Sequence, residues 1–343
     1  MDMELRGIDP ATLEEPAAVA AVRQLNDGFK NYQVMLAGFR SGLFDWLQSN
    51  GPAERSAIGP ALNLRGAHLA GFLQALEDIG LLTRQDNAYS LAPGMETVLC
   101  QDSPWHQAEV VNELLDPDNG WSALDRFMSN DWTPRKPPLP APLRHPYAGE
   151  ARRLISTLAP RFKNKTVRSI LCFDGGDGMF AAAAWRHFPE ARMTVVVPAE
   201  AQQRVRRMLA DCGIDCGVDD RCSVLPGTPM DPPPGEQVDL AVLFHALYTV
   251  RRTTNDALAA VGARLAPGGE LHCAHWFCLE ACDTAPGGLR DLDKAVLTNS
   301  HPMCHVETFC DRFAKIDLVD AGREDLIGEY GVTKLHYARR PED

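Results

Sequence analysis

Between residues 167 and 277, short apolar segments alternate with segments of helical periodicity. The apolar segments cover residues 167–173, 193–197, 238–244 and 270–277, and the helical ones cover 179–187, 199–212 and 255–265. Parallel strands need a crossover connection between them, which is usually a helix. Helices then cover both faces of the sheet, so the residues of its buried strands are almost all apolar. The sequence therefore predicts an α/β fold with a doubly wound, mostly parallel, Rossmann-like sheet.

The first part of the chain predicts a different, mostly helical unit. Apolar side chains recur at helical spacing in residues 31–47 and 67–79, and residues 81–91 read as two short strands around a turn. Six prolines between 134 and 146 exclude a regular helix there, so this stretch is a linker or a pocket-covering loop. We predict a helical, winged-helix-like domain over residues 1–160 and an α/β domain over residues 161–343. A chain of 343 residues, 45% of them hydrophobic, suffices for two packed domains.

Charge and hydropathy exclude several classes of partner. The chain has 34 Lys and Arg against 46 Asp and Glu, a net charge of −12, and no basic block, so its field repels nucleic acid and anionic membranes. No apolar run reaches the ~18 residues of a membrane helix, and the first residues do not resemble a secretory signal. We expect a cytoplasmic protein, whose ten cysteines are thiols.

The segment ILCFDGGDGMF, residues 170–180, carries the most chemical information. A strand is predicted to end at Asp174, and Gly175, Gly176 and Gly178 then allow a tight turn in which a ligand approaches the backbone at the next helix's N-terminus. A glycine-rich turn without a ligand would have the same sequence. The motif therefore predicts a binding site only together with its context.

Over nearly its whole length the chain resembles the small-molecule O-methyltransferases of the caffeate and hydroxyindole type, which use S-adenosylmethionine (SAM). The resemblance is carried by residues 42–47 and 73–82, similar to that family's N-terminal dimerisation domain, by residues 173–178, similar to its SAM loop, and by residues 265–271, similar to the turn before its fifth strand. It implies a homodimer in which the helical domain covers the substrate pocket, with SAM as cofactor and a small molecule as acceptor.

One departure from the family concerns the ribose of SAM. The family has an acidic residue at the end of the second strand, where this chain has the valines of residues 195–197. Glu200 is our candidate substitute, and the alternative is that Glu200 is a solvated first-turn residue favoured by the helix dipole. The cofactor-binding residues implied by the resemblance are Asp174, Gly175, Gly176, Gly178, Val197, Glu200 and Phe244.

A second departure concerns the catalytic base. Family members that methylate a hydroxyl group carry a His-Asp pair after the fourth strand, because a hydroxyl is a poor nucleophile until a base takes its proton. Here Tyr248 stands near the expected histidine, without an acidic neighbour in the sequence, and His245 lies three residues earlier. The acceptor side is predicted to contain Tyr147, His245, Tyr248, His275 and His301, the first four as catalytic residues.

A sulfur acceptor would explain why the chain lacks a catalytic base. A thioether has a lone pair and no proton, so methyl transfer rests on alignment alone, and aromatic rings can stabilise the sulfonium product. The favoured hypothesis is an S-methyltransferase, similar to the bacterial 4-methylthio-2-hydroxybutyrate S-methyltransferases of dimethylsulfoniopropionate synthesis. The alternative is an O-methyltransferase with His245 or Tyr248 as base.

The C-terminal region is rich in imidazole and thiol groups, which suit zinc, copper or haem iron. They are His272, Cys273, His275, Cys278, Cys282, His301, Cys304, His305 and Cys310. No Cys-x-x-Cys pair occurs, and strand alternation sends His272 and His275 to opposite faces. We predict no metal site. The alternative is an enzyme with the methyltransferase fold that carries out other chemistry with a metal or haem bound at these residues.

A winged-helix regulator is disfavoured, because residues 65–79 contain only Arg65 and His68 as basic groups.

Overall fold

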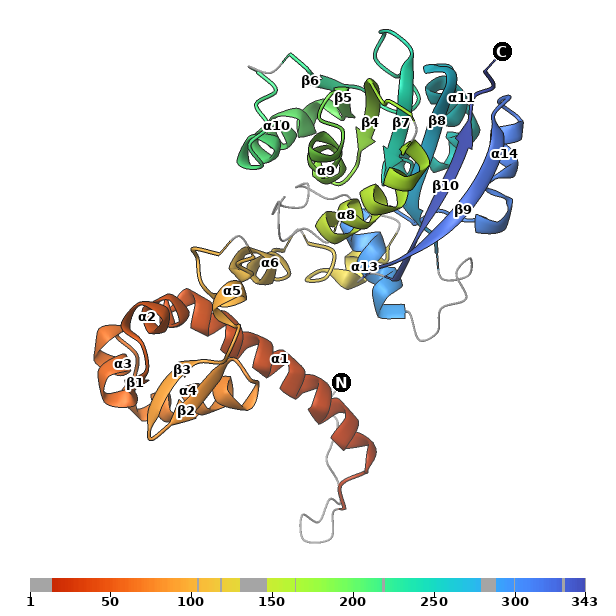
Figure 1. Ribbon diagram of the computed structural model, residues 1–343. Helices are drawn as coiled ribbons and strands as arrows, with labels where there is room; N and C mark the ends of the chain where they lie inside the picture. The colour runs from red at the N-terminus through yellow and green to blue at the C-terminus, as the bar shows by residue number, and fades with distance from the viewer. Residues whose placement is uncertain are drawn as a thin grey trace. The chain divides into compact units, whose positions relative to one another are not determined.

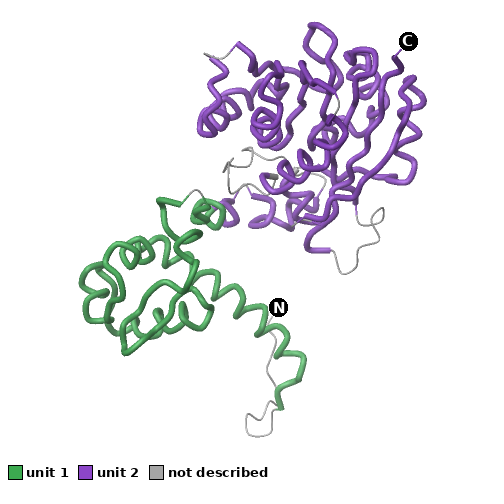
Figure 2. The backbone as a smooth tube through the Cα atoms, in the orientation of Figure 1, with its two compact units in different colours: residues 1–112 green, residues 113–343 purple. Residues whose placement is uncertain are grey.

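The computed structural model describes residues 14–103, 105–117, 119–129, 147–163, 165–217, 220–278, 288–298, 300–328 and 331–342. The chain divides into two compact units, residues 1–112 and 113–343 (Figure 2). The boundary predicted at residue 160 lies inside the second unit, because helix α8 (Tyr147–Leu158) packs against helix α9 (Met179–His187) of the α/β domain.

The first unit has the predicted order of helices and hairpin. Its helices are α1 (Ala18–Arg40), α2 (Leu43–Asn50), α3 (Arg55–Ala61), α4 (Gly66–Asp78), α5 (Glu96–Leu99) and α6 (Ala108–Glu113), the last running one residue into the second unit. Strands β1 (Ala53–Glu54), β2 (Leu82–Gln85) and β3 (Ala88–Leu91) form an antiparallel sheet in the order β1-β3-β2. The predicted single helix over residues 31–47 is two helices, because Gly42 adopts φ +71°, which ends α1.

The core of the first unit lies between α2 and α4. Leu43 and Leu47 of α2 and Leu69, Leu73 and Leu76 of α4 are all buried in one cluster. Their spacing of three and four residues places them on one side of each helix, so the apolar periodicity alone accounts for this packing.

The second unit is built on a seven-stranded sheet in the order β6-β5-β4-β7-β8-β10-β9. The strands are β4 (Ser169–Asp174), β5 (Arg192–Val197), β6 (Cys222–Pro226), β7 (Val238–Phe244), β8 (Leu265–Trp276), β9 (Val319–Gly328) and β10 (Gly331–Arg339). The first five are parallel, and β10 is antiparallel to β8 and β9. The predicted doubly wound, mostly parallel sheet is confirmed. The sequence did not reveal three strands: β6, which is short, β9, whose side chains are mostly exposed, and β10.

Helices cover both faces of this sheet; Figure 1 shows α8 and α9 on one side and α11 on the other. The helices after α6 are α7 (Leu124–Phe127), α8, α9, α10 (Gln202–Asp211), α11 (Thr254–Gly262), α13 (Gly288–Thr298) and α14 (Asp311–Ala314). Short 3-10 turns are η1 (Ala159–Phe162), η2 (Ala199–Ala201), η3 (Tyr248–Thr253) and η4 (Val306–Thr308).

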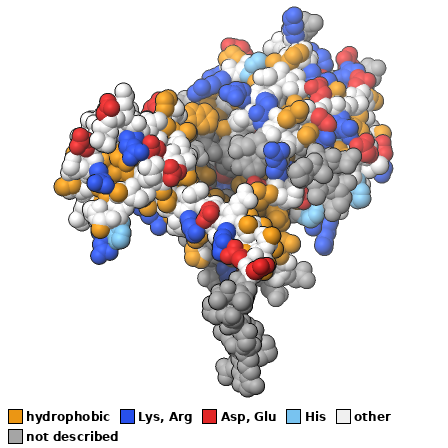
Figure 3. Space-filling model, turned by 90° about the horizontal axis from the view of Figure 1, so that it is seen from below, with side chains coloured by type: hydrophobic (Ala, Val, Ile, Leu, Met, Phe, Trp, Pro, Cys, Tyr) orange, Lys and Arg blue, Asp and Glu red, His pale blue; other side chains and the backbone are white. Residues whose placement is uncertain are grey.

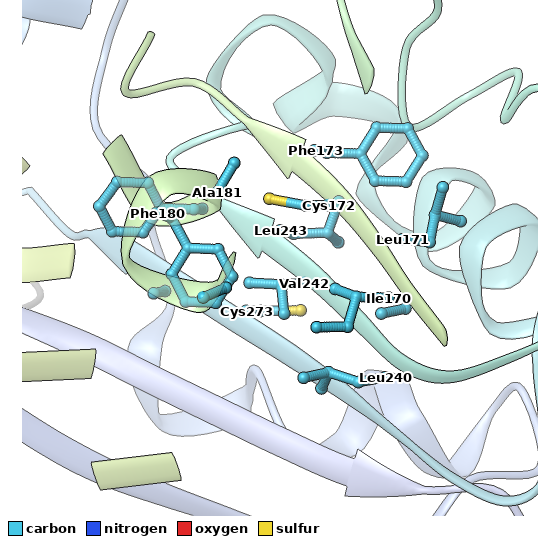
Figure 4. Close-up of a cluster of buried hydrophobic side chains, with 14 of the residues drawn as sticks. Ile170, Leu171, Cys172, Phe173, Phe180, Ala181, Leu240, Val242, Leu243 and Cys273 are labelled. Atoms are coloured by element: carbon cyan, nitrogen blue, oxygen red, sulfur yellow. The ribbon is translucent and has the colours of Figure 1, made fainter. Parts of the chain in front are cut away.

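The core of the second unit holds strands β4 and β7 together (Figure 4). Ile170 and Cys172 of β4, Leu240 and Val242 of β7 and Phe180 of α9 are almost completely buried in one cluster. Asp174, the last residue of β4, pairs with Phe244, the last residue of β7. The core therefore brings the loops that follow these two strands to the same edge of the sheet.

The face of the molecule seen in Figure 3 carries charges of both signs, with Lys and Arg side chains among Asp, Glu and hydrophobic ones. Within the described ranges, no helix combines the length and the apolar character needed to span a bilayer.

Candidate functional site

A cavity of about 210 Å³ opens at the carboxyl ends of β4, β5 and β7. The chain moves from β4 outward to β5 and β6 and then returns to the other side of β4 as β7, so the cavity lies where the strand order reverses. Open α/β sheets bind ligands at this point. A larger hollow of about 840 Å³ lies on the first unit, but its polar lining, such as Glu54, Arg55 and Asn63, is exposed and organises no site.

Asp174 forms the floor of the cavity beneath the glycine turn. Its carboxylate accepts hydrogen bonds from the backbone N–H groups of Gly176 and Ala181, both at 2.9 Å. Burial raises the pKa of Asp174 to about 6, although these backbone hydrogen bonds oppose the rise. A cation in the cavity would favour the ionised form of this carboxyl group.

Two glycines of the turn are required by close approach. The Gly175 N–H donates to the Phe244 carbonyl at 2.7 Å, and a Cβ at position 175 would lie 2.3 Å from the carbonyl oxygen of His245. Gly178 has φ +91°, and a Cβ there would lie 2.5 Å from Cε of Met208. The glycines therefore let β4 and the start of α9 pack against their neighbours.

An ion pair that the sequence did not reveal also lines the cavity. Arg204 of α10 donates from Nε and Nη2 to Asp177 Oδ1, at 2.9 and 2.6 Å. Burial raises the pKa of Asp177, and the charge of Arg204 opposes that rise. The cavity thus presents a guanidinium group and two carboxyl groups, those of Asp174 and Asp177.

Only some of the predicted cofactor-binding residues line the cavity. Asp174 and Gly175 line the cavity, and Gly176 and Gly178 lie in the turn that shapes it. Val197 and Phe244 are buried at the ends of β5 and β7, outside the cavity lining, whereas Glu200 is exposed and also outside it. Pro198 and Thr228 occupy the wall where the sequence suggested Val197 and Glu200.

The acceptor side contains a buried chain of hydrogen bonds. Tyr248 and His245 line the cavity, with 2.7 Å between Tyr248 Oη and His245 Nδ1. His245 Nε2 lies 2.6 Å from Glu150 Oε2 of α8. Trp276 donates its backbone N–H to Tyr248 Oη and its indole N–H to Glu150 Oε1, each at 2.8 Å. With His245 protonated on Nε2, the phenol donates to Nδ1 and the imidazole donates to Glu150.

Glu150 is the functional residue that sequence reasoning missed. Burial raises its pKa, but attraction to His245 and hydrogen bonds from His245, Trp276 and Thr333 outweigh this, so the pKa lies below its ordinary value. Glu150 is therefore a buried carboxylate at neutral pH. The signal was present: Glu150, Leu154 and Leu158 follow one another at four-residue spacing, which puts the acid on the buried face of α8.

Among the other predicted acceptor residues whose side chains the structure describes, His275 and His301 lie outside the cavity lining. His275 Nε2 accepts hydrogen bonds from the backbone N–H groups of Ala246 and Leu247, at 3.1 and 3.0 Å, and the side chain is behind the cavity wall. Burial lowers its pKa well below the ordinary value, so His275 is neutral and holds the loop before η3 in place. The side chain of Tyr147 is outside the described residues.

The histidines and cysteines of the C-terminal region that the structure describes belong to no group of three or more His, Cys, Asp or Glu that could hold a metal ion. His272 Nε2 lies 2.8 Å from Glu270 Oε2, and His275 contacts the amides on the other side of β8, as alternation along the strand predicted. Cys282 is outside the described residues.

The fold is shared with solved methyltransferase structures. An O-methyltransferase family protein from Burkholderia thailandensis matches with a TM-score of 0.72 and 16% identity over 95% of this chain and 99% of its own. PigF, solved with SAH, matches with a TM-score of 0.68 and 19% identity over 95% and 100% of the two chains. Human N-acetylserotonin methyltransferase, solved with SAM, matches with a TM-score of 0.64 and 17% identity over 96% and 99%. At these identities the likeness shows the fold alone.

No protein-family model matches the sequence, and comparison with curated proteins finds no relative.

Proposed function

We propose that this chain is a SAM-dependent methyltransferase that acts on a small molecule. The observation that carries the proposal is the cavity at the point where the strand order reverses, with the glycine turn and the buried carboxyl group of Asp174 on its wall. The structures of PigF with SAH and of human N-acetylserotonin methyltransferase with SAM share this fold over nearly their whole length, which supports the choice of cofactor.

The residues of the cavity fit the chemical groups of SAM. When bound, SAM supplies a methyl group on a cationic sulfonium and becomes a neutral thioether. Burial opposes the ionisation of the Asp174 carboxyl group. The positive charge of SAM in the cavity would favour the ionised form, and the resulting carboxylate would in turn attract SAM. Arg204 presents a guanidinium that suits the carboxylate of an amino acid.

The structure changes the choice of acceptor. The sulfur hypothesis rested on the absence of an acidic partner for His245 or Tyr248 in the local sequence. Glu150 supplies that partner at 2.6 Å from His245, so we propose an acceptor that carries a proton, a hydroxyl or an amine. A hydroxyl acceptor corresponds to the O-methyltransferase alternative given above.

Tyr248 and His245 can then remove the acceptor's proton together. The Tyr248 oxygen accepts that proton while the phenol's own proton moves to His245 Nδ1. The imidazolium that forms faces the carboxylate of Glu150, which stabilises its charge. Bound SAM would supply the methyl group, and His245 would hold the proton until it leaves through Tyr248 and the cavity.

A thioether acceptor, such as 4-methylthio-2-hydroxybutyrate, is the second candidate. Apolar side chains, among them Phe173, Val196 and Leu297, line much of the cavity, and the ring of Tyr248 can stabilise a sulfonium. No proton is removed in this case, so the Glu150–His245–Tyr248 chain would only hold the wall in place.

We also propose the homodimer implied by the family resemblance, in the cytoplasm. Val22, Leu25 and Phe29 are exposed on α1 at a spacing of three and four residues, so they form an apolar stripe on one side of the helix. Sedimentation of the full chain should give a dimer, and Phe29→Glu should shift it toward monomer.

Titration calorimetry with SAM tests the proposed function first. We expect saturable one-to-one binding at micromolar affinity, with weaker binding by Arg204→Met. Radiolabelled SAM incubated with phenols, amines and thioethers then identifies the acceptor class. Absence of SAM binding by folded protein would overturn the proposal.

A further inference from the structure

The segment after α10 brings two thiols into direct contact. Sγ of Cys216 lies 2.7 Å from Sγ of Cys222, the first residue of β6. This separation is shorter than the van der Waals contact of two sulfur atoms and longer than the covalent bond of about 2.05 Å. Cys216 is half-buried and reachable from solvent, whereas Cys222 is buried.

The sulfur atoms of the other described cysteines have no contact as short as this one. None of the nine described cysteines forms a disulfide. Cys278 and Cys304 approach to 3.5 Å between their sulfur atoms, and Cys212 contacts the sulfur of Met208 at 3.8 Å. Among the described residues, Cys216 and Cys222 are therefore the pair that needs the least movement to join.

We propose that Cys216 and Cys222 are a redox modification site that closes reversibly to an intramolecular disulfide. The oxidant is a low-molecular-weight disulfide of the glutathione type. The Cys216 thiolate attacks it and releases one small thiol, and Cys222 then attacks the mixed disulfide and releases a second one. Two protein thiols and one small disulfide thus give one protein disulfide and two small thiols. The two protein protons end on the released thiolates.

The bond would join two elements that carry walls of the cavity. Helix α10 carries Arg204, and its C-terminal segment leads to Cys216. Strand β6 starts at Cys222 and leads to Gly227, Thr228 and Pro229, which also line the cavity. A disulfide between the two segments restricts the unfolded chain, so oxidation should raise the melting temperature by several degrees.

Mass spectrometry of the full-length protein tests the site directly. The protein is equilibrated with glutathione disulfide, alkylated and digested with trypsin without reduction. Cleavage after Arg207 and Arg221 separates a peptide with Cys212 and Cys216 from one that begins at Cys222. We expect these two peptides to remain joined, with loss of two reactive thiols and full recovery on reduction with dithiothreitol.

Three single variants make the assignment specific. Cys212→Ser should keep the crosslink, because Cys212 shares the peptide but not the contact. Cys216→Ser should abolish both the crosslink and the rise in melting temperature, and Cys278→Ser, a matched variant elsewhere, should change neither. If Cys216→Ser loses its fold, oxidation of Cys212→Ser still decides the pairing. Glutathione attached to Cys216 without a crosslink, or a crosslink lost in Cys212→Ser, would overturn the proposal.

Discussion

His245 Nε2 lies 2.6 Å from Glu150 Oε2, although the two residues are 95 positions apart in the chain. Both side chains are almost fully buried, and Tyr248 connects them to the cavity through its hydrogen bond to His245. A buried carboxylate behind an imidazole stabilises the positive charge that the imidazole gains when it accepts a proton. The pair is therefore suited to proton removal at the cavity wall.

Glu150→Gln keeps the shape of the side chain and removes its charge. For a hydroxyl or amine acceptor we expect kcat to fall by ~10² to 10⁴, and Tyr248→Phe to lower it comparably. Glu190→Gln, at an exposed position, is the matched control. Near-normal rates with a thioether acceptor in both variants would instead support the sulfur hypothesis.

Asp174 should release a proton when SAM binds. Its pKa is raised by burial to about 6 in the free protein, and a bound cation lowers it. Release should therefore be absent at pH 8, where the carboxyl group is already ionised, begin near pH 6 and be largest below pH 6, between the pKa values of the bound and the free protein. Calorimetry at pH 6 in two buffers of different ionisation enthalpy measures the proton directly. Equal enthalpies in both buffers, or unchanged release in Asp174→Asn, would contradict this prediction.

Gly175→Ala should damage both the fold and the cavity. The added Cβ would lie 2.3 Å from the backbone oxygen of His245, so strand ends must move apart, at a cost of about 1–3 kcal/mol. Gly71→Ala is the matched control, because the exposed position 71 lies in α4 with no atom within 4 Å of the new Cβ, and it should stabilise by up to about 1 kcal/mol. Urea unfolding of both variants checks the sign of each change.

Glu270 should stabilise the second unit except in acid. Its carboxylate lies 2.8 Å from His272 Nε2 and 3.0 Å from Arg161 Nε. Burial raises the pKa of Glu270, but the hydrogen bonds and charges of His272 and Arg161 outweigh this and lower it to about 2. A carboxyl group whose pKa is lower in the folded than in the unfolded protein stabilises the fold at pH values above its unfolded pKa. The contribution of Glu270 is therefore present above about pH 4.5 and disappears as the pH falls toward 2.

We expect Glu270→Gln to lower the free energy of unfolding by about 1–3 kcal/mol at pH 7. Near pH 2 the difference from the wild type should be much smaller. Urea unfolding at both pH values tests this, and an equal loss at both would exclude the ionised carboxylate as the cause.

Arg204 and Glu200 should differ in their effect on SAM affinity. Arg204 lines the cavity, so Arg204→Met should weaken binding about tenfold or more, as expected when a charged partner is lost. Glu200 is exposed and outside the lining, so Glu200→Ala should change the dissociation constant by less than threefold. Calorimetric titration of both variants decides the matter. A loss of about 1–3 kcal/mol in Glu200→Ala would restore its assignment to the ribose hydroxyls.

The sequence by itself determined the local structure of this protein. The apolar runs of β4, β5, β7 and β8, the helical stripes of α2 and α4 and the glycine turn after Asp174 follow from residue spacing and backbone conformation, which neighbouring residues fix. The cavity-lining positions of Asp174, Gly175, His245 and Tyr248 follow in turn, because parallel strands end at one edge of the sheet.

Only the tertiary structure decided what those residues contact. Glu150 contacts His245, Arg204 donates to Asp177, and His275 accepts from backbone amides. These contacts form because helices from distant parts of the chain pack onto the sheet and determine which buried polar groups face one another. A buried charge must find a partner, but local spacing cannot say which distant residue provides it. Glu150 therefore escaped sequence reasoning, although His245 and Tyr248 did not, since Glu150 lies on a helix that precedes the whole sheet.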